Sequence, residues 1–236
     1  MRFRQGELSG QVALPHPSQL ATNVAMTDKA WIELLLSSTQ IMFAEGTPLM
    51  SRLVPVQAPV EVWQHYPADD VVNGEFGSRY FYHCHPPGKR LDGEHGHFHL
   101  FLAKSAMPTG SEPLRKPLDI DPNEQRADVV HIAALSISID GLPLAWFTTN
   151  RWVTDEWLYP AQVVTACLAR FDLRGECGDP LVNDWLTAMV ALSHTKLTAL
   201  LGQRDRVLEV RDRTGEDRAI EVASFDPINI KRLLTL

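Results

Sequence analysis

The stretches SRYFYHCH (78–85) and HGHFHLFLA (95–103) decide the fold of this chain. Both alternate along their length and are rich in aromatic residues, as β-strands are. The stretch VVHIAALSISI (129–139) predicts a third strand, and Asp140-Gly141 predicts a tight hairpin turn into a fourth. The centre of the chain therefore predicts an antiparallel meander of about four or more strands.

Helical patterns flank this centre on both sides. Apolar residues recur at helical spacing from Thr27 to Gly46, where a capping residue begins the pattern and a glycine ends it. Residues 160–171 and 180–202 predict two further helices, and the charged stretch QRDRVLEVRDRTGEDR (203–218) could extend the second as a solvated face. The order helix, strands, helices predicts an α+β fold, with an antiparallel sheet packed against N- and C-terminal helices.

The chain is expected to form one domain over residues 1–236, because its length fits one large domain. Residues 1–25 show no sustained period and are expected to be irregular. Residues 104–128 contain four prolines and several charges, which predicts a long loop.

Composition and charge exclude several classes of partner. The formal net charge of −7 argues against binding to nucleic acid or to an anionic membrane, where basic residues supply the affinity. No apolar stretch is long enough to span a bilayer, and no apolar run follows the N-terminal arginines as in a signal peptide.

Three cysteines cannot all pair and show no C-x-x-C spacing, which favours reduced thiols and a cytoplasmic location.

Five of the nine histidines fall within seventeen positions, at His83, His85, His95, His97 and His99. Side chains alternate between the two faces of a strand, so the first two share a face and the last three share a face. A simple antiparallel register pairs His85 with His95 and His83 with His97. Paired Cβ atoms then lie about 4.5–5.5 Å apart, which brings enough imidazoles together to bind a metal ion.

These residue types indicate a divalent metal site, with zinc or iron as the ion and three of the five histidines as ligands. Glu94 has the opposite strand parity to His95, but it could act as ligand, as partner of a ligand or as general base. Arg151 could hold an anionic group of a substrate. We therefore expect a metal-dependent hydrolase of a small anionic substrate, with His97, Glu94 and Arg151 as the catalytic candidates.

Two residues of the predicted hairpin could extend the site. The two-residue turn would place His131 opposite Asn150, with His131 on the face of Leu135. Whether either residue joins the histidines depends on strand order, which the sequence leaves open. Cys84 is expected to point away from the histidines, because its parity opposes that of its neighbours.

HGHFHLF also resembles the histidine-triad motif of nucleotide hydrolases and transferases. That resemblance implies a metal-free alternative in which His97 attacks an α-phosphate. Gly96 replaces the hydrophobic residue that is usual in the motif, and His83 and His85 have no counterpart in it.

A longer resemblance rests on RYFYHCHPPG, EHGHFHLFL, HIAALSISIDGLPLAWFTTNRWVTDE and the helices that follow. Over about residues 27–200 these stretches resemble an uncharacterised family of bacterial proteins, a domain of unknown function. The resemblance implies no activity, so a third hypothesis stays open: a non-enzymatic protein that binds a metal or another chain.

Overall fold

The computed structural model describes residues 26–54, 60–117 and 128–235. Six strands form a single antiparallel sheet in the order β1-β2-β3-β4-β5-β6, so each strand pairs with its neighbours along the chain. The strands are β1 (Tyr66–Asn73), β2 (Ser78–His83), β3 (Glu94–Ala103), β4 (Val129–Ser138), β5 (Pro143–Thr149) and β6 (Val222–Pro227). The predicted meander corresponds to β2–β5, and the α+β fold class is confirmed.

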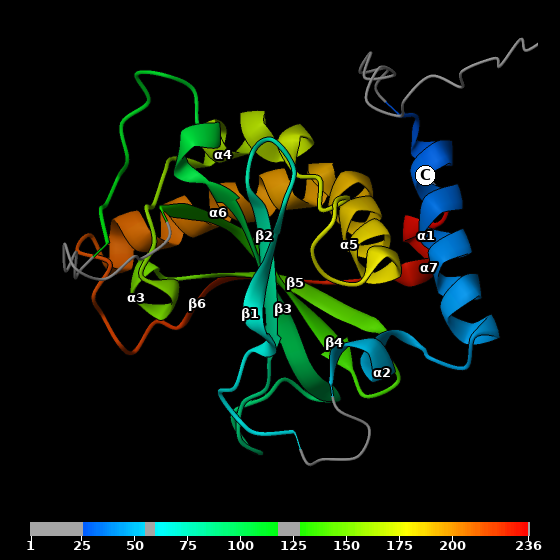
Figure 1. Cartoon of the computed structure of the whole chain (residues 1–236). Helices are drawn as coiled ribbons and strands as arrows, with labels where there is room; N and C mark the ends of the chain where they lie inside the picture. The colour runs from blue at the N-terminus through cyan, green and yellow to red at the C-terminus, as the bar shows by residue number, and fades with distance from the viewer. Residues whose placement is uncertain (1–25, 55–59, 118–127, 236) are drawn as a thin grey trace, which may run out of the picture.

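Helices lie at both ends of the chain. They are α1 (Asp28–Ala44), α2 (Leu49–Leu53), α3 (Arg151–Thr154), α4 (Ala161–Cys167), α5 (Pro180–Leu192), α6 (His194–Arg211) and α7 (Ile230–Leu233), with short 3-10 turns η2 (Lys104–Ala106) and η3 (Leu168–Arg170). Figure 1 shows α4, α5 and α6 on one side of the sheet, with α1 packed beside α5. No helix in these described ranges is long and apolar enough to cross a membrane.

The helix starts follow from their capping residues. Thr27 Oγ1 accepts a hydrogen bond from the Ala30 amide at 3.3 Å at the start of α1. Asp179 accepts hydrogen bonds from the amides of Leu181 and Val182 at the start of α5, with Pro180 in the first position. These side chains satisfy amides that have no partner within the helix, as the sequence predicted.

The prediction of one continuous helix over residues 180–202 is wrong, whereas the extension of the helix beyond Gly202, which the sequence left open, is found in the structure. The helix is interrupted at Ser193, whose buried hydroxyl accepts a hydrogen bond from the Trp146 indole at 2.9 Å. The next helix then runs through Gly202 and ends at Arg211. A glycine inside a helix costs only about 1 kcal/mol, so packing on α6 overrides this stop signal.

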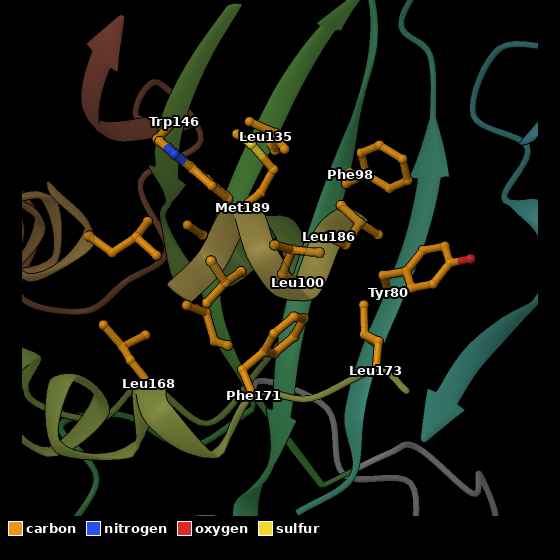
Figure 2. Close-up of a cluster of buried hydrophobic side chains, with 14 of the residues drawn as sticks. Tyr80, Phe98, Leu100, Leu135, Trp146, Leu168, Phe171, Leu173, Leu186 and Met189 are labelled. Atoms are coloured by element: carbon orange, nitrogen blue, oxygen red, sulfur yellow. The ribbon is translucent and has the colours of Figure 1, made fainter. Parts of the chain in front are cut away.

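One face of the sheet forms the apolar core. Figure 2 shows residues of the strands packed against residues of α5 and of the segment that precedes it. The labelled strand residues are Tyr80, Phe98, Leu100, Leu135 and Trp146, and their labelled partners are Leu168, Phe171, Leu173, Leu186 and Met189. Cys84 lies in this core, as its strand parity predicted. Because strand side chains alternate, the neighbouring residues of β2 and β3 project from the opposite face, where the histidines lie.

Two β-bulges in the β3–β4 pair change which residues share that face. The first lies between Glu94 and Gly96, and the second between Leu100 and Phe101. A bulge inserts one residue and shifts the alternation of every residue beyond it. As a result His131 pairs with Phe101. The expectation that His131 shares a face with Leu135 is therefore wrong.

The hairpin between β4 and β5 keeps the predicted register from Ala134 to Ser136, but a register shift between Ser136 and Ile137 gives it a longer turn. Ala134 pairs with Phe147, which is the pairing that the two-residue turn at Asp140-Gly141 predicted. The observed turn is longer, because the Ser138 amide donates a hydrogen bond to the Leu142 carbonyl at 2.9 Å. Within the predicted 104–128 loop, the described residues include η2. Residues 118–127 and the predicted irregular segment 1–25 lie outside the described ranges.

Candidate metal centre

His83 and His97 face each other across the β2–β3 pair. They are direct Cα partners in the sheet, which confirms the register predicted from strand alternation. Their Nε2 atoms lie 2.8 Å apart, and His97 is buried. The sheet backbone therefore brings two imidazole nitrogens to one point.

His85 follows the end of β2 and completes a group of three. One ring nitrogen from each of His83, His85 and His97 lies within 4.8 Å of the other two. Zinc binds imidazole nitrogen at 2.0–2.1 Å, so two nitrogens of a tetrahedral site would be about 3.4 Å apart. The 2.8 Å between His83 and His97, and the 4.8 Å limit for the pairs with His85, are compatible with that value, so the three histidines can hold a metal ion.

Glu94 supports His97 from behind. The first β-bulge turns its side chain toward His97, and Oε1 lies 2.6 Å from His97 Nδ1. The Ser136 hydroxyl donates to Glu94 Oε2 at 3.0 Å. Burial opposes ionisation, but these hydrogen bonds lower the pKa of Glu94 below its usual value.

A carboxylate only accepts hydrogen bonds, so the proton of neutral His97 belongs on Nδ1 and the lone pair on Nε2. That lone pair then points at His83. A carboxylate behind a histidine in this way orients ligand histidines in many metal sites.

His83 and His85 are held neutral by their surroundings. Burial, together with the nearby His97, His85 and His65, lowers the pKa of His83 to about 2. Burial also lowers the pKa of His85, with His97 as the next cause. Neutral imidazoles keep the lone pairs that a metal ion needs, without competition from protons at neutral pH.

His99 and His131 form a separate pair beside the three. His99 Nδ1 lies 3.1 Å from His131 Nε2, and Thr149 Oγ1 lies 3.3 Å from His131 Nδ1. Burial lowers the pKa of His99 well below its ordinary value and that of His131 to about 3. The ring of His99 is 5.0 Å from that of His97, so this pair borders the cluster.

The structure places His95 away from the other histidines. Its Nδ1 lies 2.7 Å from the hydroxyl of Tyr82, a core residue, and the two rings stack. The expectation that His95 shares the face of His97 is wrong because the bulge between Glu94 and Gly96 shifts the alternation, so that Glu94 lies on the side of His97 and His95 does not. Gly96 lies beneath the same tyrosine, where a Cβ atom would be 2.6 Å from the Tyr82 hydroxyl.

Arg151 and Asn150 are also placed away from the histidines. The Arg151 guanidinium donates to the backbone carbonyls of Lys116 at 2.7 Å and Thr214 at 3.1 Å. Asn150 donates to Asp212 Oδ2 at 2.7 Å and caps α3. Both side chains hold loops together, and neither lines the pockets beside the histidines.

A pocket of about 350 Å³ opens beside His85 and His97. We call it the apolar pocket, because its walls include Leu91, Phe147, Val153, Val222 and Phe225. Lys89 and Arg90, from the connection between β2 and β3, also line it. Sequence reasoning missed this basic pair, although it lies between the two histidine stretches, where it could have been noticed.

The fold and the site thus define an α+β protein whose antiparallel sheet carries three clustered histidines beside a pocket. Residues 29–228 match the profile of a domain of unknown function, DUF6969. This match covers most of the chain, so the chain belongs to that family. No curated protein and no solved structure matched in the corresponding comparisons.

Proposed function

We propose that this protein is a metal-dependent hydrolase of a small anionic substrate, with zinc or iron held by His83, His85 and His97. The observation that carries the proposal is the convergence of three ring nitrogens within 4.8 Å at the edge of a pocket. Zinc is favoured over iron, because non-haem iron sites of this type commonly use two histidines and a carboxylate. Here Glu94 is engaged by His97 and lies behind it.

The chain supplies the parts that hydrolysis would need. When bound to three histidines, a zinc ion lowers the pKa of a water ligand to near neutral and polarises a carbonyl or phosphoryl oxygen. Glu94 would fix the tautomer and orientation of His97. Lys89 and Arg90, which line the apolar pocket, would attract a negatively charged substrate toward the site.

The histidine-triad alternative has less support from the geometry. A nucleophilic imidazole needs a ring nitrogen facing a phosphate. The Nδ1 atom of His97 lies 2.6 Å from Glu94, and its Nε2 atom lies 2.8 Å from His83. Both nitrogens are thus engaged, an arrangement that suits a metal ligand better than a nucleophile.

The test is reconstitution of untagged, full-length protein after removal of metal by a chelator. Zinc or iron(II) would be added back, and hydrolysis of small carboxylate esters and phosphate monoesters would be measured. Near-stoichiometric metal and metal-dependent turnover are the expected results. Stoichiometric metal without turnover of any of these substrates would favour a storage or sensing role, and a phosphorylated His97 in metal-free protein would favour the triad alternative.

A further inference from the structure

A second pocket of about 390 Å³ reaches the histidine cluster from another side. It is lined by His83 of the cluster, by the neighbouring His99, and by the polar residues His65, Asp70, Arg79, Thr154 and Asp155; we call it the polar pocket. The apolar pocket is lined by His85 and His97, and the two pockets have His99 and Val153 in common. An ion held by His83, His85 and His97 would therefore lie where the two pockets meet.

Arg79 gives the polar pocket a site for an anion. Its Nη1 donates to Asp70 Oδ2 at 3.2 Å. Its Nε is buried and has no hydrogen-bond partner within the described part of the chain. The rest of the Arg79 side chain is about a quarter exposed. A guanidinium that donates to one carboxylate through Nη1 can still donate to a second carboxylate through its accessible N–H groups.

The position of Arg79 also sets the length of the ligand. Arg79, Phe81 and His83 project from the same face of β2, and all three line the polar pocket. By the rise of a β-strand, the Cα atoms of Arg79 and His83 are about 13 Å apart. A carboxylate at Arg79 would thus need several further bonds to reach the ion, and those atoms would pass over Phe81, whose ring is stacked on His65 at 3.8 Å.

We propose that the ligand of this site is a molecule with a carboxylate at one end and an apolar group at the other. The carboxylate binds Arg79 in the polar pocket, the apolar group packs on Phe147 and Phe225 in the apolar pocket, and the linking atoms lie beside the histidines. This inference rests on the proposed function and narrows its substrate class. It assigns the anion contact to Arg79 in preference to Arg90, whose Nε donates to the His85 carbonyl.

Calorimetric titration of the zinc-loaded full chain tests the proposal with three probes. N-benzoylglycine carries both ends, N-methylbenzamide lacks the carboxylate, and N-acetylglycine lacks the ring. N-benzoylglycine is expected to bind about tenfold more tightly than either of the others, as a charge-assisted hydrogen bond or a buried ring allows. Equal affinities for the three probes in the unmodified chain, or no binding of any at millimolar concentration, would overturn the proposal.

Variants then locate the two ends. Arg79→Gln is expected to weaken binding of N-benzoylglycine about tenfold and to leave N-methylbenzamide unchanged. Phe225→Ala should weaken both ring-bearing probes, and Arg90→Gln should change neither beyond about twofold. A loss with Arg90→Gln in place of Arg79→Gln would refute the assignment to Arg79.

Zinc content and melting temperature of each variant separate these effects from misfolding. The same titrations on metal-free protein separate the two proposals. Arg79-dependent binding by a chain that takes up no metal would leave the ligand assignment standing and overturn the proposed function. Stoichiometric zinc with no Arg79-dependent binding would overturn the ligand assignment and leave the proposed function standing.

Discussion

The Nε2 atoms of His83 and His97 lie 2.8 Å apart on directly paired positions of β2 and β3, with Glu94 behind His97. Two lone pairs that converge in this way repel each other unless a proton or a metal ion lies between them. In the metal-free protein a single N–H can bridge the two rings. A metal ion would replace that proton and draw in His85, which makes the pair the natural starting point for testing the site.

Removal of either member of this pair should abolish metal binding. His83→Ala and His97→Ala each leave two of the three ligands, so we expect near-stoichiometric zinc in the unmodified chain and little or none in these variants. Elemental analysis of untagged protein measures the result. His95→Ala is the matched control, because His95 lies in the same stretch but contacts Tyr82. Loss of metal in His95→Ala as large as that in His97→Ala would refute this assignment of ligands.

Replacement of Glu94 should weaken the metal site without removing a ligand. Glu94→Gln keeps the size of the side chain but removes the negative charge beside His97 Nδ1, so zinc affinity should fall by about 10–100-fold. Competition with a chelator of known affinity measures the change. Ser136→Ala removes only one hydrogen bond to Glu94 and should cause a smaller loss. An affinity unchanged in Glu94→Gln would mean that the carboxylate does not support the site.

Two glycine-to-alanine changes should shift stability in opposite directions. A Cβ at Gly96 would clash with the Tyr82 hydroxyl and the His83 carbonyl, so Gly96→Ala should destabilise the protein by about 1–3 kcal/mol. Gly202 lies inside α6, where the nearest neighbour of a Cβ is the flexible Arg206 side chain at 3.5 Å. Gly202→Ala should therefore stabilise it by up to about 1 kcal/mol. Urea unfolding of both variants gives the comparison, and a stabilising Gly96→Ala would contradict it.

Glu156 should make the protein less stable as the pH rises toward 8. Burial raises the pKa of this carboxyl from 4.5 to about 8, although Arg204 and a hydrogen bond from the His131 amide oppose the shift. Between these values the folded chain keeps a proton that the unfolded chain has released. Unfolding therefore releases a proton in this window, and stability falls as pH increases from about 4.5 through about 8.

The variant Glu156→Gln isolates this effect. The amide oxygen can still accept from the His131 amide but does not ionise, so its melting temperature should vary less between pH 6 and pH 9 than that of the unmodified chain. The difference between the two curves removes the contribution of other titrating groups. Parallel curves would show that Glu156 is not protonated in the folded protein.

Strand alternation predicted much of the sheet but not its edges. The aromatic and apolar runs of β2, β3, β4 and β5 read clearly, because these strands are paired on both sides and bury one face fully. The edge strands β1 and β6 were not predicted. YPADDVVN is polar with a register shift after Tyr66, and VASFDP is short and partly exposed, so neither carries a strong alternating pattern.

The candidate site was predicted as far as simple alternation holds. The pairing of His83 with His97 followed from that rule, whereas the placement of His95 and Glu94 depended on a bulge. The sequence gives no signal for that bulge apart from Gly96. Arg79 could have been identified, since it has the same parity as His83, but the loop contacts that engage Arg151 arise only from the tertiary fold.

The histidine cluster rests on a sheet whose apolar core lies on the opposite face, under α5. We therefore expect the chain to fold without an ion, unlike a zinc finger, which is unfolded without its metal. Pairing of β2 and β3 already brings His83 and His97 together, so only His85 would have to move toward an ion, and most of the free energy of coordination would go into affinity. Such a preorganised site can lose and regain its ion reversibly, so occupancy in the cell would follow metal supply.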